Sequence, residues 1–195
     1  MGGRSVGDVS GKGLSASLYM SKLQTMMQLY CTEDRSPKEV LTEVNKKIFA
    51  AIGKNWFITV PIALFDTSKN SVAFCRAGHT ELLVANADTI TTYRPEGIGV
   101  GLEKGDVFDS IIEQIEIPIH NNDLFAFFSD GVNESMNEKE EQYGIERLNE
   151  ILKNNGNSHA DSILRGIVNF LTEFRSTAEQ HDDITLVLIK ASTNQ

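Results

Sequence analysis

The sequence predicts an α+β protein in which antiparallel β-sheet is covered by segregated helices. Its 195 residues are 41% apolar, enough for a sizeable core, so we expect a single domain over residues 1–195. Hydrophobic periodicity gives the order of elements as two helices, a block of strands, two helices and a last strand. This order differs from the alternating βαβ pattern of a parallel sheet, and short connections such as residues 66–70 favour antiparallel pairing.

Two helices are predicted near the N-terminus. For the first, apolar residues recur at helical spacing at Leu14, Leu18, Leu23, Met26, Met27 and Tyr30. The methionine face of this helix, Met20, Met26 and Met27, could form a switching interface, but core packing is the favoured interpretation. The second helix begins at Ser36-Pro37-Lys38-Glu39, a capping box with proline at the first helical position, and ends near Gly53.

The strands and the remaining helices follow in order. Strands are predicted at residues 57–65, 72–77, 82–84, 89–93, around the alternating Ile115, Ile117 and Ile119, at 124–128 and at 184–189. Helices are predicted at residues 145–152 and 163–174. Residues 95–109 are rich in glycine and polar at their end, so we expect a surface loop there.

Charge and composition exclude several classes of protein. With 27 acidic and 18 basic residues the net charge is −9, which argues against a nucleic-acid partner. The sequence has neither an apolar run of about 18 residues nor a secretory signal, so we expect no membrane contact and a cytoplasmic protein. The isolated Cys31 and Cys75 are interpreted as small core hydrophobes in a reducing compartment.

The segment GDVSGKG, residues 7–13, could be a phosphate-binding loop, a metal site or a turn before a helix. A phosphate-binding loop requires glycine where Val6 stands and a hydroxyl residue where Gly13 stands, so this interpretation fails twice.

Three aspartates favour the metal interpretation. Asp8 lies in this segment, Asp130 follows an apolar strand, and Asp182 precedes the last strand. Each one alone is more often a turn or cap residue. Together they supply the oxygen ligands that Mg²⁺ and Mn²⁺ prefer, if the fold brings them together.

Four sequence blocks together resemble the bacterial metal-dependent serine phosphatases of the type 2C fold, in the branch of the sporulation stage II protein E and the stress-response sigma-factor regulators. The blocks are GDVSGKGLSASLYM at residues 7–20, RAGHTELLV at 76–84, LFAFFSDGVNES at 124–135 with the following YGIERL, and HDDITLVLIK at 181–190. They occur in the order found in the family and cover essentially the whole chain.

This resemblance implies two stacked antiparallel sheets flanked by helices, with a pair of Mn²⁺ or Mg²⁺ ions at one end of the sheets. By the family pattern Asp8 would bridge both ions and the carbonyl of Val9 would contribute a further ligand. Asp130 and Asp182 would complete the protein ligands of one ion, with Asp183 as the second choice for the place of Asp182.

The implied activity is that of a protein serine/threonine phosphatase. Two ions roughly 3.5 to 4 Å apart lower the pKa of a bridging water and clamp the oxygens of an in-line displacement, so hydroxide attacks the phosphoserine directly. Members of this branch typically act on an anti-anti-sigma protein, and an upstream sensory or regulatory region controls them. The sequence leaves open whether the chain forms a homodimer. His79 and His181 lie near the motifs, but neither is assigned a catalytic role.

The N-terminus departs from the family pattern. The family carries a Gly-Gly-Asp-aromatic-Tyr-Asp run on two earlier strands, whereas residues 1–5 contain no acid and lack the apolar residues of a strand. We therefore expect the first strands to be missing. This departure keeps a second hypothesis open, a non-catalytic signalling module of the same fold that binds a partner.

Overall fold

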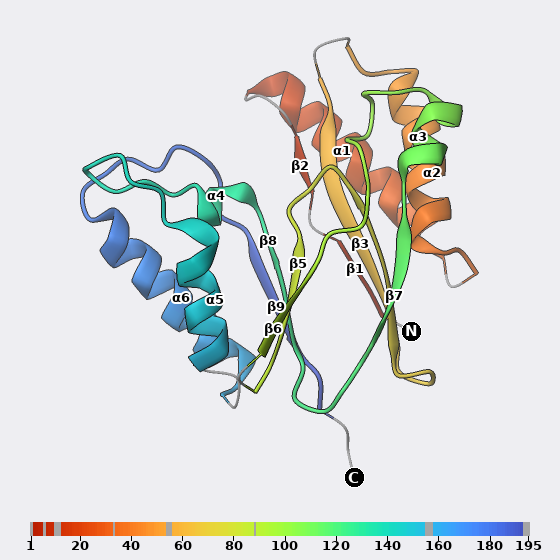
Figure 1. Cartoon of the computed structure of the whole chain (residues 1–195). Coiled ribbons are helices and arrows are strands. Elements are labelled where there is room, and N and C mark those ends of the chain that lie inside the picture. The colour runs from red at the N-terminus through yellow and green to blue at the C-terminus, as the bar shows by residue number, and fades with distance from the viewer. Residues whose placement is uncertain are drawn as a thin grey trace. The chain divides into compact units, whose positions relative to one another are not determined.

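The computed structural model describes residues 2–5, 7–9, 13–32, 34–53, 56–87, 89–154 and 158–192, with the backbone alone for residues 2–5 and 8. The chain packs as two compact units, Met1–His79 with Arg94–Pro118 and Thr80–Tyr93 with Ile119–Gln195. Each unit contains one antiparallel sheet and its own helices (Figure 1). The predicted α+β class with antiparallel sheets and flanking helices is confirmed.

The sheet of the first unit has the strand order β1-β3-β4-β7, and β2 also pairs with β3. Its strands are β1 (Gly2–Ser5), β2 (Asp8–Val9), β3 (Ile58–Asp66), β4 (Ser71–Ala77) and β7 (Gln114–Pro118). Every pairing is antiparallel. The four-residue turn between β3 and β4 is the short connection that the sequence predicted.

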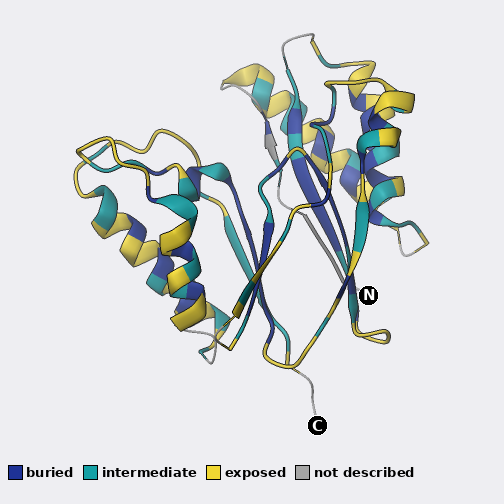
Figure 2. Ribbon diagram, in the orientation of Figure 1, coloured by how far each residue is buried: buried dark blue, intermediate teal, exposed yellow. Residues whose placement is uncertain are grey.

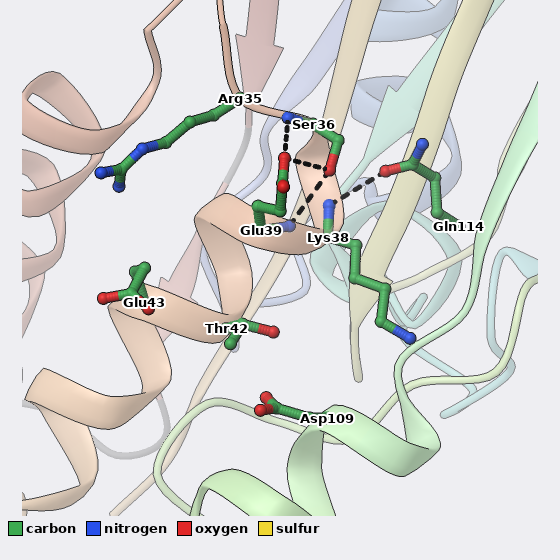
Figure 3. A pocket seen from close by; sticks show the side chains of 8 residues that line it. All are labelled: Arg35, Ser36, Lys38, Glu39, Thr42, Glu43, Asp109 and Gln114. Carbon is green, nitrogen blue, oxygen red and sulfur yellow. Dashed lines mark hydrogen bonds between the residues drawn. The ribbon is translucent and has the colours of Figure 1, made fainter.

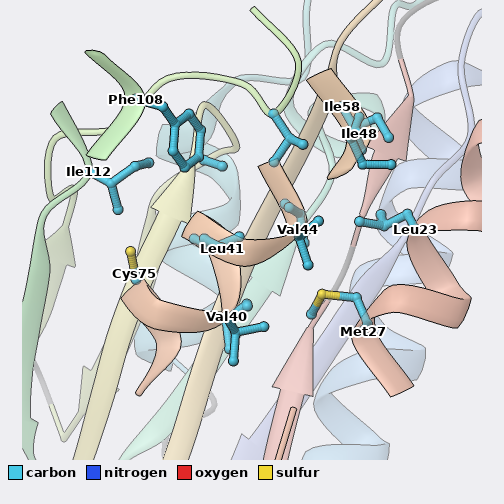
Figure 4. Packing of buried hydrophobic residues seen from close by; sticks show 14 of the residues in the cluster. Leu23, Met27, Val40, Leu41, Val44, Ile48, Ile58, Cys75, Phe108 and Ile112 are labelled. Atoms are coloured by element: carbon cyan, nitrogen blue, oxygen red, sulfur yellow. The ribbon is translucent and has the colours of Figure 1, made fainter. Parts of the chain in front are cut away.

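Three helices build the core of this unit: α1 (Leu14–Tyr30), α2 (Pro37–Phe49) and α3 (Gly105–Ile111). Figure 4 shows Val44 and Ile48 of α2 between side chains of α1 and of the strands. Met27 is buried in the same cluster, and Met20 and Met26 pack against it, so the methionines of α1 are core residues, as predicted. In Figure 2 the buried residues follow the strands and the helix faces that cover them.

The beginning of α2 confirms the predicted capping box. The Ser36 backbone N–H donates to the Glu39 carboxylate over 2.8 Å, and the Glu39 N–H donates to the Ser36 hydroxyl over 3.3 Å. The Lys38 N–H donates to the side-chain oxygen of Gln114 on β7, which ties this helix end to the sheet (Figure 3). A cavity of about 550 Å³ lies beside the first turn of α2, and Asp109 of α3 also lines this cavity.

The second unit has a four-stranded sheet in the order β6-β5-β8-β9. Its strands are β5 (Leu82–Asn86), β6 (Thr89–Tyr93), β8 (Leu124–Phe128) and β9 (Leu186–Lys190), and its helices are α4 (Asp130–Asn133), α5 (Gly144–Asn154) and α6 (Ala160–Arg175). Apolar residues of α5 and α6 pack against alternate residues of the strands, among them Leu83 and Ala85 of β5. The two long helices therefore cover one face of this sheet (Figure 1).

Residues 95–109 are not simply a surface loop, because α3 begins within them. Phe108 is fully buried against α2, and Val100 forms a β-bridge with Ile58. The fully buried Asn45 of α2 accepts from the Gly101 N–H and donates to the Glu103 carbonyl. These contacts from elements distant in sequence fix a segment whose own composition favours a loop.

The expectation that residues 1–5 form no strand is also wrong. Residues 2–5 form β1, which pairs with β3 from Gly2 opposite Phe65 to Ser5 opposite Ile62. Ladder hydrogen bonds join backbone groups, so a strand with a partner does not need an apolar pattern of its own.

Leu14 and Leu18 of α1 fit the predicted helical spacing but are 79% and 62% exposed. The step from Leu18 to Leu23 is five residues, which at about 100° per residue turns the helix surface by about 140°. The two leucines therefore lie on another face of α1 than Leu23 and Met27, which are buried.

The two cysteines differ in their surroundings, and only one matches the prediction. Cys75 on β4 is fully buried, whereas Cys31 at the end of α1 is exposed. Burial raises the pKa of the Cys75 thiol to about 12, and partial desolvation also raises the pKa of the Cys31 thiol.

We expect a thiol reagent such as DTNB at pH 8 to modify Cys31 alone in the folded protein. Cys75 combines a raised pKa with no access, and reactivity requires an accessible thiolate. In guanidinium chloride both thiols should react, and the variant Cys31→Ser should show no fast phase. Two fast equivalents in the native protein would contradict the burial of Cys75.

Candidate metal centre

The second unit brings together two of the three predicted aspartate blocks. All five residues of β8 are buried, and the chain leaves this strand at the buried Ser129 to enter the single turn of α4, which begins at Asp130. Asp130 is half-buried, and its carboxylate accepts from the Gly131 N–H over 3.0 Å.

Ser129 holds the Asp-Asp block beside this turn. Its hydroxyl donates to the Asp183 carbonyl and accepts from the Thr185 N–H, each over 2.9 Å. Its backbone N–H donates to the Thr185 carbonyl, also over 2.9 Å. The pairing of β8 with β9 continues from Phe128 opposite Leu186, so these contacts extend the ladder to the two acidic blocks.

Gly131 allows the two blocks to approach closely. A Cβ atom on this residue would lie 2.3 Å from the Asp183 carbonyl oxygen, far inside van der Waals contact. Asp182 and Asp183 are exposed, and the Asp182 carboxylate accepts from the Asp183 N–H over 2.9 Å. The structure therefore places Asp130 and Asp182–Asp183 at the same end of the second sheet, where β8 ends and β9 begins. Their role as metal ligands stays a prediction.

Asp8 and Val9 lie in the first unit, on β2. Asp8 stands opposite Thr59 of β3 and Val9 opposite Ile58, and Val9 is buried. The Asp8 side chain and residues 10–12, including Lys12, lie outside the described part of the structure. The meeting of Asp8 and Val9 with the other predicted ligands stays a prediction.

The described residues suit a hard cation by their chemistry. No ion pair within the described ranges engages the carboxylates of Asp130, Asp182 or Asp183, so all three are available to a cation. Carboxylate and carbonyl oxygens are the ligands that Mg²⁺ and Mn²⁺ prefer. Among the described side chains alone, no group of three His, Cys, Asp or Glu residues is close enough to hold an ion.

A cavity of about 140 Å³ adjoins the Asp-Asp block within the second unit. Its lining includes Gly131, Ser135, Met136, Arg175 and Asp182. The Arg175 guanidinium is held by the Gln180 side chain over 3.1 Å and by the Ala178 carbonyl over 3.2 Å.

Sequence reasoning assigned no role to His79, and the structure gives this residue a defined partner. The His79 side chain is only 6% exposed, and its Nδ1 lies 2.9 Å from the hydroxyl oxygen of Thr59. The RAGHT segment was a signal for this residue, but nothing in the sequence pointed to Thr59, which lies 20 positions earlier. The other candidate, His181, is exposed and lines the cavity beside Asp182.

The fold has counterparts among solved structures. The SiaA-PP2C domain of Pseudomonas aeruginosa matches with a TM-score of 0.83 and 18% identity, covering 96% of this chain and 75% of that chain. The RsbU and RsbW domains of Rv1364c from Mycobacterium tuberculosis match with a TM-score of 0.81 and 19% identity, covering 99% and 52%. The fold is thus that of the PP2C phosphatase domains.

Sequence comparison then identifies the family. The chain belongs to the Stage II sporulation protein E (SpoIIE) family, whose model matches residues 4–192. It is 26% identical over 187 residues to the phosphoserine phosphatase RsbU of Bacillus subtilis (strain 168), covering 95% of this chain. The chain spans 54% of the length of that relative. The predicted family resemblance is confirmed.

Two other structures of this fold involve a metal, one as a Mn presoak and one as a magnesium complex. The SpoIIE phosphatase domain of Bacillus subtilis, presoaked with Mn, matches with a TM-score of 0.59, and RsbX in complex with magnesium matches with a TM-score of 0.65.

Among the described helices of the present chain, none has the length and apolar content needed to cross a membrane.

Proposed function

We propose that this chain is a single metal-dependent protein serine/threonine phosphatase domain that removes phosphate from a phosphoserine of a regulatory protein. The observation that carries the proposal is that Ser129 bonds to the Asp183 carbonyl and Gly131 approaches it closely, which keeps the chain on both sides of Asp130 beside the Asp-Asp block. Membership of the SpoIIE family and the likeness to RsbU support the same chemistry.

The proposed ligands of two Mn²⁺ or Mg²⁺ ions are Asp8, the carbonyl of Val9, Asp130 and Asp182, with Asp183 as the second choice for the place of Asp182. Such ions, when bound, supply a nucleophile at neutral pH and stabilise the charge of the transferred phosphoryl group.

The protein's own part in this mechanism is positioning. Ser129 and Gly131 keep the two acidic blocks of the second unit at a fixed separation, because one bonds to the Asp183 backbone and the other leaves no room for a side chain. Preorganised groups avoid the cost of rearrangement during the reaction. The cavity beside Asp182 offers room for a substrate side chain next to the reacting phosphate.

The proposed substrate is an anti-anti-sigma protein, and the proposed setting is the cytoplasm, under the control of an upstream sensory or regulatory region. The likeness to RsbU, and to a chain that holds RsbU and RsbW domains together, supports a regulatory-protein partner.

Calorimetric titration with Mn²⁺, followed by a phosphatase assay on an aryl phosphate and on a phosphoserine protein, tests the proposal. We expect saturable Mn²⁺ binding and phosphate release that EDTA abolishes. Absence of binding at millimolar Mn²⁺ would overturn the proposal and favour the non-catalytic signalling module. Binding without phosphate release from either substrate would overturn the catalytic assignment alone.

A further inference from the structure

His79 is a buried polar residue with no part in the mechanism proposed above. It lies after β4, its side chain is 6% exposed, and its ring nitrogen Nδ1 meets the Thr59 hydroxyl at 2.9 Å. Burial of a polar group is costly unless it is hydrogen-bonded, so this contact contributes to holding β3 in place.

The surrounding backbone fixes the position of His79. The buried Arg76 donates from its guanidinium to the His79 carbonyl over 2.5 Å and to the Pro95 carbonyl over 2.9 Å. Gly78 has φ +67°, and a Cβ atom there would lie 2.8 Å from the Gly99 nitrogen. A buried guanidinium and a glycine-only turn thus hold the imidazole against Thr59.

Thr59 occupies the register position that matters for the proposed metal centre. It stands directly opposite Asp8 in the pairing of β2 with β3, and its neighbour Ile58 stands opposite Val9. β2 is only two residues long, so the place of Asp8 and Val9 depends on the part of β3 that carries them. His79 is the side chain that holds the Thr59 hydroxyl.

We infer that His79 and Thr59 form a positioning pair for the metal centre, fixing the segment of β3 on which Asp8 and Val9 are placed. The inference rests on the proposed function, because it assumes that Asp8 and Val9 are ligands. Outer groups that orient metal ligands typically change metal affinity by about 10- to 100-fold when they are removed.

The test is Mn²⁺ affinity, measured by electron paramagnetic resonance of free Mn²⁺ without substrate, in variants at Thr59. Thr59→Val keeps the shape of the side chain but removes the hydroxyl, and we expect it to weaken Mn²⁺ binding about 10- to 100-fold. Thr59→Ser keeps the hydroxyl and should restore affinity close to that of the wild type. Thr91→Val, on the exposed face of β6 in the other unit, is the matched control and should change nothing.

A second variant guards against a failure to fold at one position. His79→Gln should reproduce the loss seen in Thr59→Val, and the double variant should lose no more than either single one, because both remove the same contact. Tm is recorded for every variant, so that a change in affinity can be separated from a change in stability.

The outcomes separate this inference from the proposed function. If the wild-type protein binds no Mn²⁺, the proposed function and the positioning pair are both wrong. If the wild type binds Mn²⁺ and Thr59→Val binds it with the same affinity, only the positioning pair is wrong. Equal losses in Thr59→Val and Thr59→Ser, accompanied by a lowered Tm, would show a packing role and overturn the inference as well.

Discussion

Replacing Asp130 with asparagine is expected to lower kcat/KM for an aryl phosphate by about 10³-fold, on the order of 4 kcal/mol of transition-state stabilisation. Asparagine keeps the size of the side chain and can still accept from the Gly131 N–H, so the turn at α4 should survive. What is lost is the negative charge that the proposed ion requires. Phosphate release at saturating Mn²⁺ measures the effect.

The matched control is Asp161→Asn on α6. Asp161 is an exposed aspartate paired with Arg165 over 2.9 Å, and exposed pairs of this kind contribute little to stability. Its removal should leave turnover unchanged. Full turnover in Asp130→Asn would refute the proposed ligand set, whatever the likeness of the chain to its relatives.

Gly131→Ala is expected to lower the free energy of unfolding by about 3 kcal/mol and to weaken Mn²⁺ binding, since overpacking a fixed site forces the backbone apart. The added methyl would lie 2.3 Å from the Asp183 carbonyl oxygen, so the two acidic blocks must separate. Urea unfolding and Mn²⁺ titration of the same variant measure both effects.

Gly166→Ala is the control for this substitution. Gly166 lies inside α6, and an added Cβ would meet no atom within 4 Å beyond its chain neighbours and the backbone of its own helix. Alanine in a helix interior gains about 0.5–1 kcal/mol over glycine. We therefore expect opposite signs for the two variants. A Gly131→Ala protein as stable as the wild type, with unchanged Mn²⁺ affinity, would show that the close approach is not needed.

Local chemistry made several elements predictable. Ser36 and Glu39 are three positions apart and meet in any helix that begins there, so the capping box of α2 needed no information from the rest of the chain. The strand β8 and the aspartate after it were also predictable, because a strand that is buried on both faces must be apolar throughout. Their position at strand ends suggested that Asp130 and Asp182 lie together, and the family resemblance implied which metal-ligand role each would have.

Other features could not be predicted from the sequence, because contacts with residues far along the chain produce them. α3 depends on the burial of Phe108 and on the hydrogen bond from Asn45 to the Glu103 carbonyl, just before the helix. β1 depends on its ladder with β3. Cys31 follows an apolar segment, but it lies at the end of a helix, where it is exposed. The composition of the neighbouring residues does not reveal this exposure.

By itself, the sequence determined the four longer helices α1, α2, α5 and α6, most strands, the family and the identity of the candidate ligands, since these follow from periodicity, short-range caps and motif order. Only the tertiary structure decided that Ser129 bonds to the Asp-Asp block and that His79 meets Thr59. Such contacts depend on strand register, and a shift of one residue would turn each side chain to the opposite face.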